Sequence, residues 1–233
     1  MPTVVSTDER VHRKQLRIFK KSLRNQILTS RFTTTTWNEN ELYRKTHNNV
    51  GCIYCSPDPI SKSILIDSNL FILEMNNDTN KIIGIGLIRN HNVNGKLNVY
   101  SKGNYNRYAF IGRNRIDRTE MTEEEDLVMQ IFDILCFRGN THMKRGQGLK
   151  SFPTELLYTL SKKLDLIKYI GNMFKSRLLR KEVNETNKNK VMTRPIWQLI
   201  FKSPIYSSFQ RDSQENAIFL EERIVNIPSS VRK

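Results

Sequence analysis

The chain has 233 residues, 38% of them hydrophobic and 26% charged, and its formal net charge is +15 at pH 7. This apolar share supports a real core but is below the usual value, so we expect one domain with charged appendages. No apolar run approaches the ~20 residues that cross a bilayer, the start lacks a hydrophobic signal segment, and three cysteines argue against a disulfide framework. We therefore expect a soluble protein of the cytosol, the nucleus or a particle assembled there, with no membrane span.

Positive charge is concentrated in two segments. Residues 1–50 hold ten Lys and Arg against four acidic residues, and residues 134–194 hold fourteen against four. Residues 51–133 hold nine against eleven, so a near-neutral middle separates the two basic segments. One-signed segments favour a polyanion as partner, because a surface that only keeps a protein soluble is better served by mixed signs.

The first element, residues 1–30, is expected to be a basic amphipathic helix. Ser6 and Glu9 have the spacing of a capping box, and the helix should run to about Leu28. Such a helix could lie on nucleic acid, on an acidic membrane surface or in a partner's groove. We expect its apolar stripe to pack on the protein's own core; the stripe comprises Leu16, Phe19, Leu23 and Ile27. Its candidate nucleic-acid-binding residues are Arg13, Arg17, Lys20, Lys21 and Arg24.

Residues 31–181 are expected to form an α+β core domain. Two apolar runs, 70–75 and 81–88, flank an Asn- and Asp-rich connection and predict a β-hairpin. Gly84 and Gly86 on one strand mark a bulge or a close approach to the backbone. We expect a mainly antiparallel small β-barrel or curved sheet from about residue 50 to 118, flanked by helices. Its further strands are predicted from Cys52 and at residues 63–66, 96–100 and 107–112.

Helices are predicted on both sides of these strands. Asn38 with Glu41 favours a short helix to about Lys45, and Thr122 with Glu125 forms a second capping box before a buried helix that ends near residue 137. Two more helices are predicted at residues 154–163 and 165–181. Residues 182–233 are expected to form a loop to residue 190, a return strand at 194–201 and an irregular C-terminal tail.

The segment 138–150 has the strongest local pattern in the chain. It places three glycines, four cations and a histidine in 13 positions between two predicted helices. Glycines allow backbone amides to converge on one point, and neighbouring cations can neutralise a phosphate there. The alternative is a flexible connection whose charges are solvated. The candidate phosphate-binding residues are Arg138, His142, Lys144, Arg145 and Lys150.

Aromatic and basic residues alternate between positions 100 and 115. Aromatic rings among cations are typical of surfaces that stack single-stranded bases, although half of such rings at strand spacing belong to the core in any fold. The rings are Tyr100, Tyr105, Tyr108 and Phe110, and the cations are Lys102, Arg107, Arg113 and Arg115, of which we include the last two among the binding residues.

Metal and catalytic chemistry have little support in the sequence. Cys52 and Cys55, with His47 upstream, have half of a zinc-site spacing, and the second half is missing. The acidic cluster 120–126 is better explained as the start of a helix than as paired catalytic carboxylates. No hydrolase, kinase or zinc-protease motif occurs. We therefore expect no cofactor and no enzymatic activity, with a metal-dependent nuclease as the one enzyme class worth retaining.

Residues 36–90 resemble the PUA-like superfamily, in particular its EVE and YTH branches. The shared features are a Trp-containing segment, a short helix and the hairpin LFILEM followed by KIIGIGLI. The resemblance implies a small β-barrel with flanking helices that binds RNA or a modified base. Trp37 is then the first wall of a base pocket, and we include it among the nucleic-acid-binding residues; further walls cannot be placed.

Two functions remain in competition. The wealth of Asn, Ile and Lys resembles proteins encoded by large eukaryotic DNA viruses. The first prediction is a non-catalytic protein that binds RNA or DNA through the basic helix and the segment 138–150. The alternative is a minor capsid or scaffold protein of a large DNA virus particle, in which the same charges meet acidic protein surfaces. The choice between RNA and DNA, and the oligomeric state, stay open.

Overall fold

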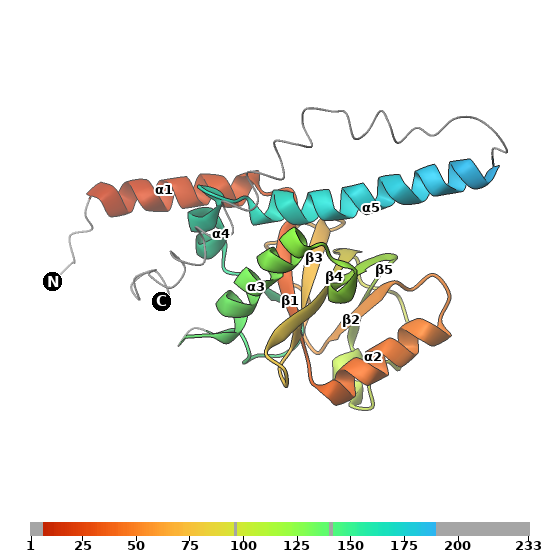
Figure 1. The fold of residues 1–233 in the computed structure, drawn as a ribbon. Helices are drawn as coiled ribbons and strands as arrows, with labels where there is room; N and C mark the ends of the chain where they lie inside the picture. Colours follow the sequence, from red (N-terminus) through yellow and green to blue (C-terminus); the bar gives the residue numbers. More distant parts are fainter. Residues whose placement is uncertain (1–6, 96, 140–141, 190–233) are drawn as a thin grey trace.

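The computed structural model describes residues 7–95, 97–139 and 142–189 of the chain (Figure 1). Its helices are α1 (Thr7–Ser22), α2 (Thr34–Thr46), α3 (Glu123–Phe137), α4 (Thr154–Ser161) and α5 (Leu166–Asn189), with short 3-10 turns η1 (Gly103–Asn106) and η2 (Arg118–Glu120). Its strands are β1 (Gln26–Phe32), β2 (Cys52–Ser56), β3 (Asn69–Asn76), β4 (Lys81–Arg89), β5 (Tyr108–Gly112), β6 (Asn114–Asp117) and β7 (Lys150–Ser151).

The strands form one mixed sheet of five strands and a separate pair. The larger sheet has the order β6-β4-β3-β1-β7, and β2 pairs with β5 in the smaller one. β1 and β3 run parallel, with Gln26 opposite Leu70, while the other pairings are antiparallel. The α+β class is therefore confirmed. The expected barrel is wrong for the described residues, whose strands make two open sheets instead of closing on one another.

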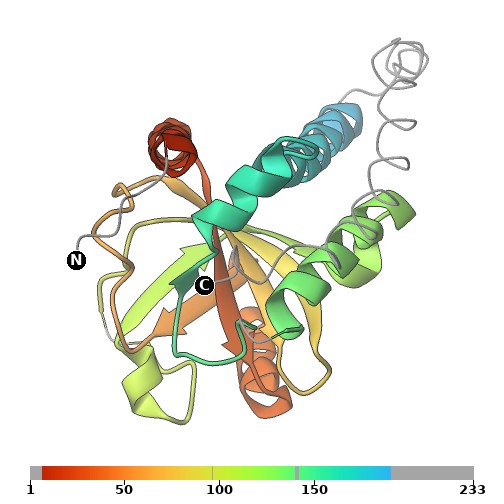
Figure 2. The ribbon, with the colours of Figure 1, turned by 90° about the vertical axis from the view of Figure 1, so that its left-hand side faces the viewer.

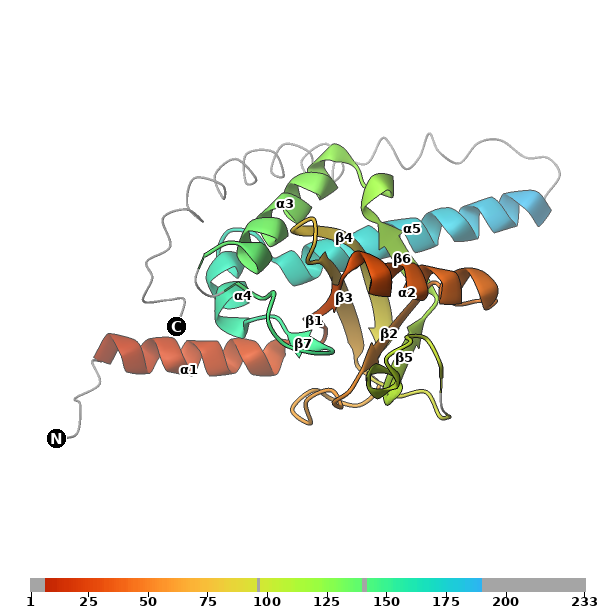
Figure 3. The ribbon, with the colours of Figure 1, turned by 90° about the horizontal axis from the view of Figure 1, so that it is seen from below.

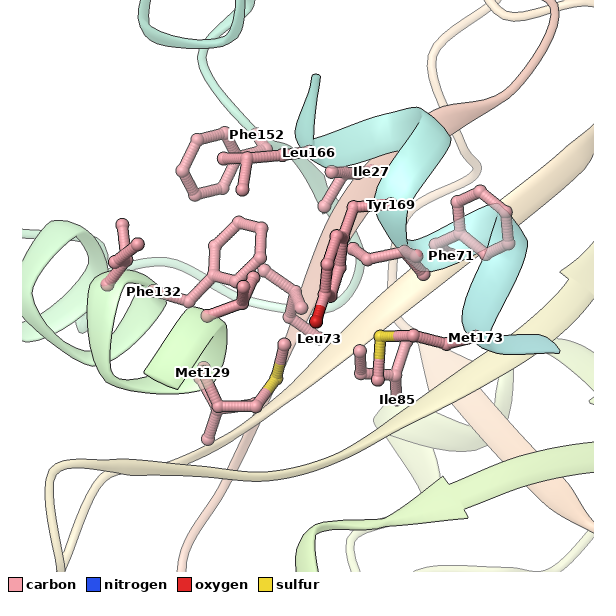
Figure 4. Packing of buried hydrophobic residues seen from close by; sticks show 14 of the residues in the cluster. Ile27, Phe71, Leu73, Ile85, Met129, Phe132, Phe152, Leu166, Tyr169 and Met173 are labelled. Carbon is pink, nitrogen blue, oxygen red and sulfur yellow. The ribbon is translucent and has the colours of Figure 1, made fainter. Parts of the chain in front are cut away.

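The five-stranded sheet has a hydrophobic core on each of its faces. Alternate residues of β3 point to opposite sides, so Phe71 and Leu73 join one cluster and Leu70 and Ile72 join the other. The first cluster packs against α3, α4 and α5, which lie on one side of the sheet (Figure 2). Figure 4 shows this cluster, with Phe132 and Tyr169 of the helices facing Leu73 and Ile85 of the sheet. The second cluster is shared with β2, β5 and α2.

The first helix is shorter than its sequence pattern predicts. α1 ends at Ser22, whereas Ile27 and Leu28 lie in β1, a central strand that pairs with β3 and β7. Ile27 continues the helical stripe in sequence, but it is 1% exposed in the sheet core. Tertiary pairing thus overrides the local helical pattern. Ser6, the expected cap, lies outside the described residues.

Other local predictions have mixed outcomes. The hairpin is confirmed as β3 and β4, and the helix capped by Thr122 and Glu125 is confirmed as α3. The helix expected at Asn38 starts earlier, because Thr33 caps α2 in a box with Thr36. The strands expected at residues 63–66 and 96–100 are wrong: the first segment forms turns, and no strand is assigned to the described residues of the second.

The predicted helices near residues 154–163 and 165–181 are confirmed as α4 and α5. The loop predicted from residue 182 is wrong, because α5 continues to Asn189. The return strand expected at 194–201 lies outside the described residues. α1 and α5 extend from the sheet in opposite directions (Figures 1 and 3). Across the described ranges, none of the helices is both long and apolar enough to traverse a bilayer.

Candidate ligand cavity and basic surface

The basic helix α1 is attached to the fold through α4. Its Phe19 ring lies 5.4 Å from the ring of Tyr158, whose hydroxyl donates a 2.7 Å hydrogen bond to Gln15 Oε1. His12 Nε2 lies 3.5 Å from Glu155 Oε1. These contacts use one side of the helix, so the remaining sides are left to solvent.

Most of the cations predicted on α1 are available for a partner. Arg13 forms an ion pair with Glu9 one turn earlier. The other four are exposed and form no ion pair with any described residue; these are Arg17, Lys20, Lys21 and Arg24. A phosphate that contacts them at the surface leaves both charges largely hydrated and releases counterions, so that binding needs little desolvation.

The described part of segment 138–150 is held in place by hydrogen bonds. The amide of Met143 donates to Cys136 O at 2.7 Å, and Asn77 Nδ2 donates to Lys144 O at 3.2 Å. Gly146 and Gly148 have φ values of +110° and +62°, which favour glycine. A Cβ at Gly148 would also lie 2.0 Å from Ser56 Oγ. The described residues of this segment therefore form a loop with a defined conformation.

The cations of this loop differ in their surroundings. Arg138 and Arg145 are exposed, Lys144 is half-buried, and none of the three forms an ion pair with the described residues. Lys150 Nζ lies 3.9 Å from Asp58 Oδ2, at the limit of an ion pair. His142 has a buried Nδ1 that makes no hydrogen bond with the described residues. Arg138 and Arg145 are thus the loop cations that remain fully available, whereas Lys144 also acts on Asp78, whose pKa is lowered by hydrogen bonds from Thr34 and further by the Lys144 charge.

Arg31, which sequence reasoning missed, organises the loop from β1. Its Nε donates to Met143 O at 2.5 Å, its Nη1 to Gly148 O at 3.3 Å and its Nη2 to Thr29 Oγ1 at 3.2 Å. All three acceptors are neutral. Burial lowers the pKa of Arg31 from its ordinary value. Within the described ranges, no carboxylate forms an ion pair with this guanidinium.

Arg31 lines a cavity of about 420 Å³. The wall is built from the end of β1, the start of α2, the segment that leads into η1 and the glycines of the loop. Its charged side chains are Arg31, Lys102 and Glu39, the last accepting a 3.1 Å hydrogen bond from the Ser101 amide. Its aromatic residues are Phe32, Tyr100 and Tyr105. The volume lies within the range of about 300–1,000 Å³ that is typical of small-molecule sites.

A buried polar atom in the cavity wall, Asn77 Oδ1, has no hydrogen-bond partner among the described residues. Asn77 lines the cavity, and because its Nδ2 is bound to Lys144 O, its Oδ1 is the free atom. This oxygen is buried and accepts no hydrogen bond from the described residues. Buried polar atoms are nearly always satisfied in native proteins, so this acceptor is expected to pair with a water molecule or another donor that the described residues do not supply.

Trp37 and Arg115 lie outside the residues that line this cavity. The guanidinium carbons of Arg44 and Arg115 lie 4.9 and 5.0 Å from the Trp37 ring centroid, and the Phe32 ring packs edge-on to it. Arg115 forms ion pairs with Glu74 at 2.8 Å and Asp117 at 2.7 Å. Trp37 is therefore occupied by cation–π contacts, and the charge of Arg115 is neutralised within the fold. Arg113 is exposed beside Gly112 at the end of β5.

The aromatic residues between positions 100 and 110 belong largely to the core. Phe110 and Tyr100 are 3% and 9% exposed, and Tyr105 and Tyr108 pack against the same cluster. The Tyr100 hydroxyl accepts a 3.0 Å hydrogen bond from the buried Asn40. Their alternation with cations thus reflects a buried strand and its flanks, and not an open stacking surface.

The two cysteines with half of a zinc-site spacing are buried in β2. Burial raises the pKa of both the Cys52 and Cys55 thiols to about 12. Among residues 7–95, 97–139 and 142–189, no three His, Cys, Asp or Glu side chains form a group that could hold a metal ion. The acids of the cluster 120–126 are partly engaged in structure, since Glu125 pairs with Arg177 and Asp126 with Arg118.

The two basic segments lie at opposite ends of β1. α1 precedes Gln26, whereas Arg31, near the other end of the strand, contacts the loop. Both α1 and the end of α3, where the loop begins, lie on the left-hand side of Figure 1, and this side faces the reader in Figure 2. The two backbone segments therefore share a side of the molecule but are separated by the length of a strand.

Comparisons with known proteins give no relative: no family model, curated protein or solved structure matches the chain.

Proposed function

We propose that the chain is a non-catalytic nucleic-acid-binding protein that grips phosphates with α1 and the loop 138–150. The proposal rests on the observation that the cations of these two segments are largely without ion-pair partners in the part of the chain that the structure describes. Arg17, Lys20, Lys21, Arg24, Arg138, Lys144 and Arg145 form no ion pair within the described residues. Acids of the core are instead paired with other cations, among them Glu74, Asp117, Glu125, Asp126 and Asp133, and in α1 Glu9 pairs with Arg13.

The two basic segments support a grip at two points along a strand or duplex. β1 has seven residues, and at about 3.3 Å per residue it separates the segments by roughly 20 Å. Phosphates of one DNA strand are about 7 Å apart when extended and 3.4 Å apart along a duplex axis. Both segments can therefore contact one nucleic acid at different phosphates. Contacts of this kind fix position and supply affinity without reading sequence.

The rival partner is an acidic protein surface inside an assembly. It needs the same exposed cations, and their separation along β1 suits two contacts with protein as well as two with nucleic acid. The two possible partners can be distinguished by what the isolated chain binds. A nucleic-acid binder retains affinity for a bare polyphosphate backbone, whereas a scaffold protein requires its own partner.

The proposal is tested by fluorescence anisotropy with labelled single- and double-stranded RNA and DNA of equal length at low salt. We expect wild-type binding and a loss of about tenfold when Lys144 and Arg145 both become Ala. The matched control replaces both Lys62 and Arg89 with Ala. These two exposed cations lie at the other end of the β3–β4 hairpin, where a hydrogen bond from Asn90 Nδ2 to Ile64 O connects their two segments. This control should change affinity by less than threefold.

Two results contradict the proposal. One is wild-type protein that binds none of the four nucleic acids at low salt. The other is an equal loss in the two double variants, because that outcome assigns binding to net charge alone. Binding to a purified acidic protein partner in place of nucleic acid supports the assembly function.

A further inference from the structure

The geometry of the Arg31 cavity points to a second kind of contact: we propose that it binds the phosphate monoester of a single nucleotide. The nucleotide is either free or the 5′-terminal residue of a strand. The strand-end form rests on the proposed function, because the surface cations then hold the rest of the same strand. The free form stands without it.

The first step is the missing counter-charge of Arg31. Its guanidinium is half-buried, and its described hydrogen bonds go to two backbone carbonyls and a hydroxyl. Cations in such places are normally paired with an anion, because an uncompensated charge is costly to remove from water. Since Arg31 also lines an open cavity, the missing anion is most simply a ligand group that enters it.

The second step is the wall beside the guanidinium. Gly146 lies against Arg31, since a Cβ on this glycine would be 3.9 Å from the guanidinium carbon. Backbone at positive φ in a glycine-rich loop can direct amides to an anion, and Lys102 adds a second cation to the lining. The N-terminus of α2 is not part of the anion contact, because Asp78 Oδ2 already accepts from the Thr34 amide and hydroxyl, both at 2.7 Å.

The third step is the remainder of the cavity, which fits a ring with hydrogen-bond donors. Phe32, Tyr100 and Tyr105 supply apolar surface, and the Asn77 side chain, whose Oδ1 lacks a partner among the described residues, adds a polar group to the wall. The carboxylate of Glu39 can accept from hydroxyl or amino groups at the same time. An anion, an apolar ring and several donors occur together in a nucleoside monophosphate, whereas inorganic phosphate satisfies only the first of these requirements.

The test is isothermal titration of the wild-type chain with the four ribonucleoside 5′-monophosphates, the matching nucleosides and inorganic phosphate. We expect at least one monophosphate to bind about tenfold or more tightly than both its nucleoside and inorganic phosphate. Arg31→Gln should reduce that affinity about tenfold or more, because a charge-assisted contact is lost. The control Arg89→Gln removes an exposed cation outside the cavity lining and should stay within twofold.

A second variant guards against misfolding, because Arg31 also holds the loop. Lys102→Gln changes an exposed cavity residue whose side chain forms no hydrogen bond with the described residues, and it should lower affinity about threefold or more. Circular dichroism checks that each variant is folded. If Arg31→Gln does not fold, the wild-type comparison and Lys102→Gln decide the outcome.

Oligonucleotides with a 5′-phosphate or a 5′-hydroxyl separate the two sources of the ligand. Tighter binding of the phosphorylated strand, lost in Arg31→Gln, assigns the cavity to a strand end; equal binding of the two strands with monophosphate binding intact assigns it to free nucleotide. The proposal is overturned if no monophosphate binds wild-type protein at millimolar concentration, or if folded Arg31→Gln binds as wild type. If wild-type protein binds long strands but no monophosphate, this inference alone is overturned. If it binds a monophosphate but no long strand, the proposed function alone is overturned.

Discussion

Glu74 is the residue on which the polar interior depends. It is fully buried in β3, and its carboxylate accepts hydrogen bonds from the Tyr54 hydroxyl at 2.7 Å and from Arg115 Nε at 2.9 Å. Arg115 Nη2 also lies 2.8 Å from Glu74 Oε2, outside hydrogen-bond geometry, so that contact is electrostatic. A buried carboxylate with these partners links β2, β3 and β6 and keeps Arg115 away from the surface.

Tyr54→Phe tests this network without removing a charge. Removal of a hydrogen bond to a charged group should lower the free energy of unfolding by about 1.5–3 kcal/mol in urea denaturation. Tyr108→Phe is the control, since no described residue hydrogen-bonds to that hydroxyl, and it should change stability by less than about 0.5 kcal/mol. Equal effects of the two changes would show that the Tyr54 hydroxyl does not support Glu74.

Asp126 connects stability to pH. Burial alone raises its pKa, but hydrogen bonds from Arg118 and Gln130 outweigh burial and leave the pKa below its ordinary value of 3.8. Such a group adds stability above the unfolded pKa, and this stability is lost as the pH falls through the folded pKa. Asp126→Asn should therefore be less stable at pH 7, and its unfolding free energy should fall less steeply between about pH 4 and 2 than that of wild type. A variant with the wild-type acid slope contradicts this assignment.

At the scale of elements, β4 depends on a glycine face. A Cβ at Gly86 would lie 1.9 Å from Tyr54 Oη and 2.9 Å from Cys52 Sγ, so the tyrosine of β2 occupies the space of the missing side chain. Sequence reasoning expected a bulge or a close approach here, and the structure shows both: Glu74 pairs with Gly84 and Met75 with Ile82, so Ile83 is the extra residue of a bulge in β4.

Gly86→Ala should destabilise the fold by about 1–3 kcal/mol, because a fully buried tyrosine cannot move aside without a cost. Gly103→Ala provides the control, since nothing lies within 4 Å of its added Cβ and its φ is outside the left-handed region. Thermal unfolding followed by circular dichroism distinguishes them. A tolerated Gly86→Ala would mean that β2 and β4 are packed less closely than the structure shows.

Local signals predicted elements wherever neighbouring residues decide the conformation. The Asn-rich turn predicted the β3–β4 hairpin, and the Thr122–Glu125 box predicted α3, because caps and turns are formed by residues close in sequence. Ile27 shows where this reasoning fails. Its helical spacing from Phe19 and Leu23 is real, but β1 forms because it pairs with β3, more than forty residues away, and no local pattern reports that pairing.

The candidate site was predictable only in part, for the same reason. The loop cations Lys144 and Arg145 are visible in the sequence as part of a charge cluster. Arg31 stands alone in an apolar strand, and its role depends on Met143 and Gly148, which are more than one hundred positions later in the chain. The available signal was a single cation between Ser30 and Phe32 in a β-type run, which is too common to identify a site.

At the scale of the whole molecule, charge is divided between a neutral core and two basic segments. Ion pairs such as those of Arg115, Arg118 and Arg177 neutralise the core. The two basic segments, α1 and the loop that follows α3, lie on one side of the molecule and connect to the two ends of β1. This division is the reason for which we expect polyanion affinity to follow particular residues and not the net charge of +15.

The salt dependence of DNA binding tests this claim most directly. The measurement is the slope of log affinity against log salt concentration for duplex DNA, with wild type and the Lys144→Ala, Arg145→Ala double variant. If both side chains contact phosphate, the magnitude of the slope should fall by about 1.8 in the variant, and by about 1.4 on single strands. The Lys62→Ala, Arg89→Ala variant should keep the wild-type slope. An unchanged slope in the loop variant, or equal reductions in the two variants, would contradict phosphate binding by the loop.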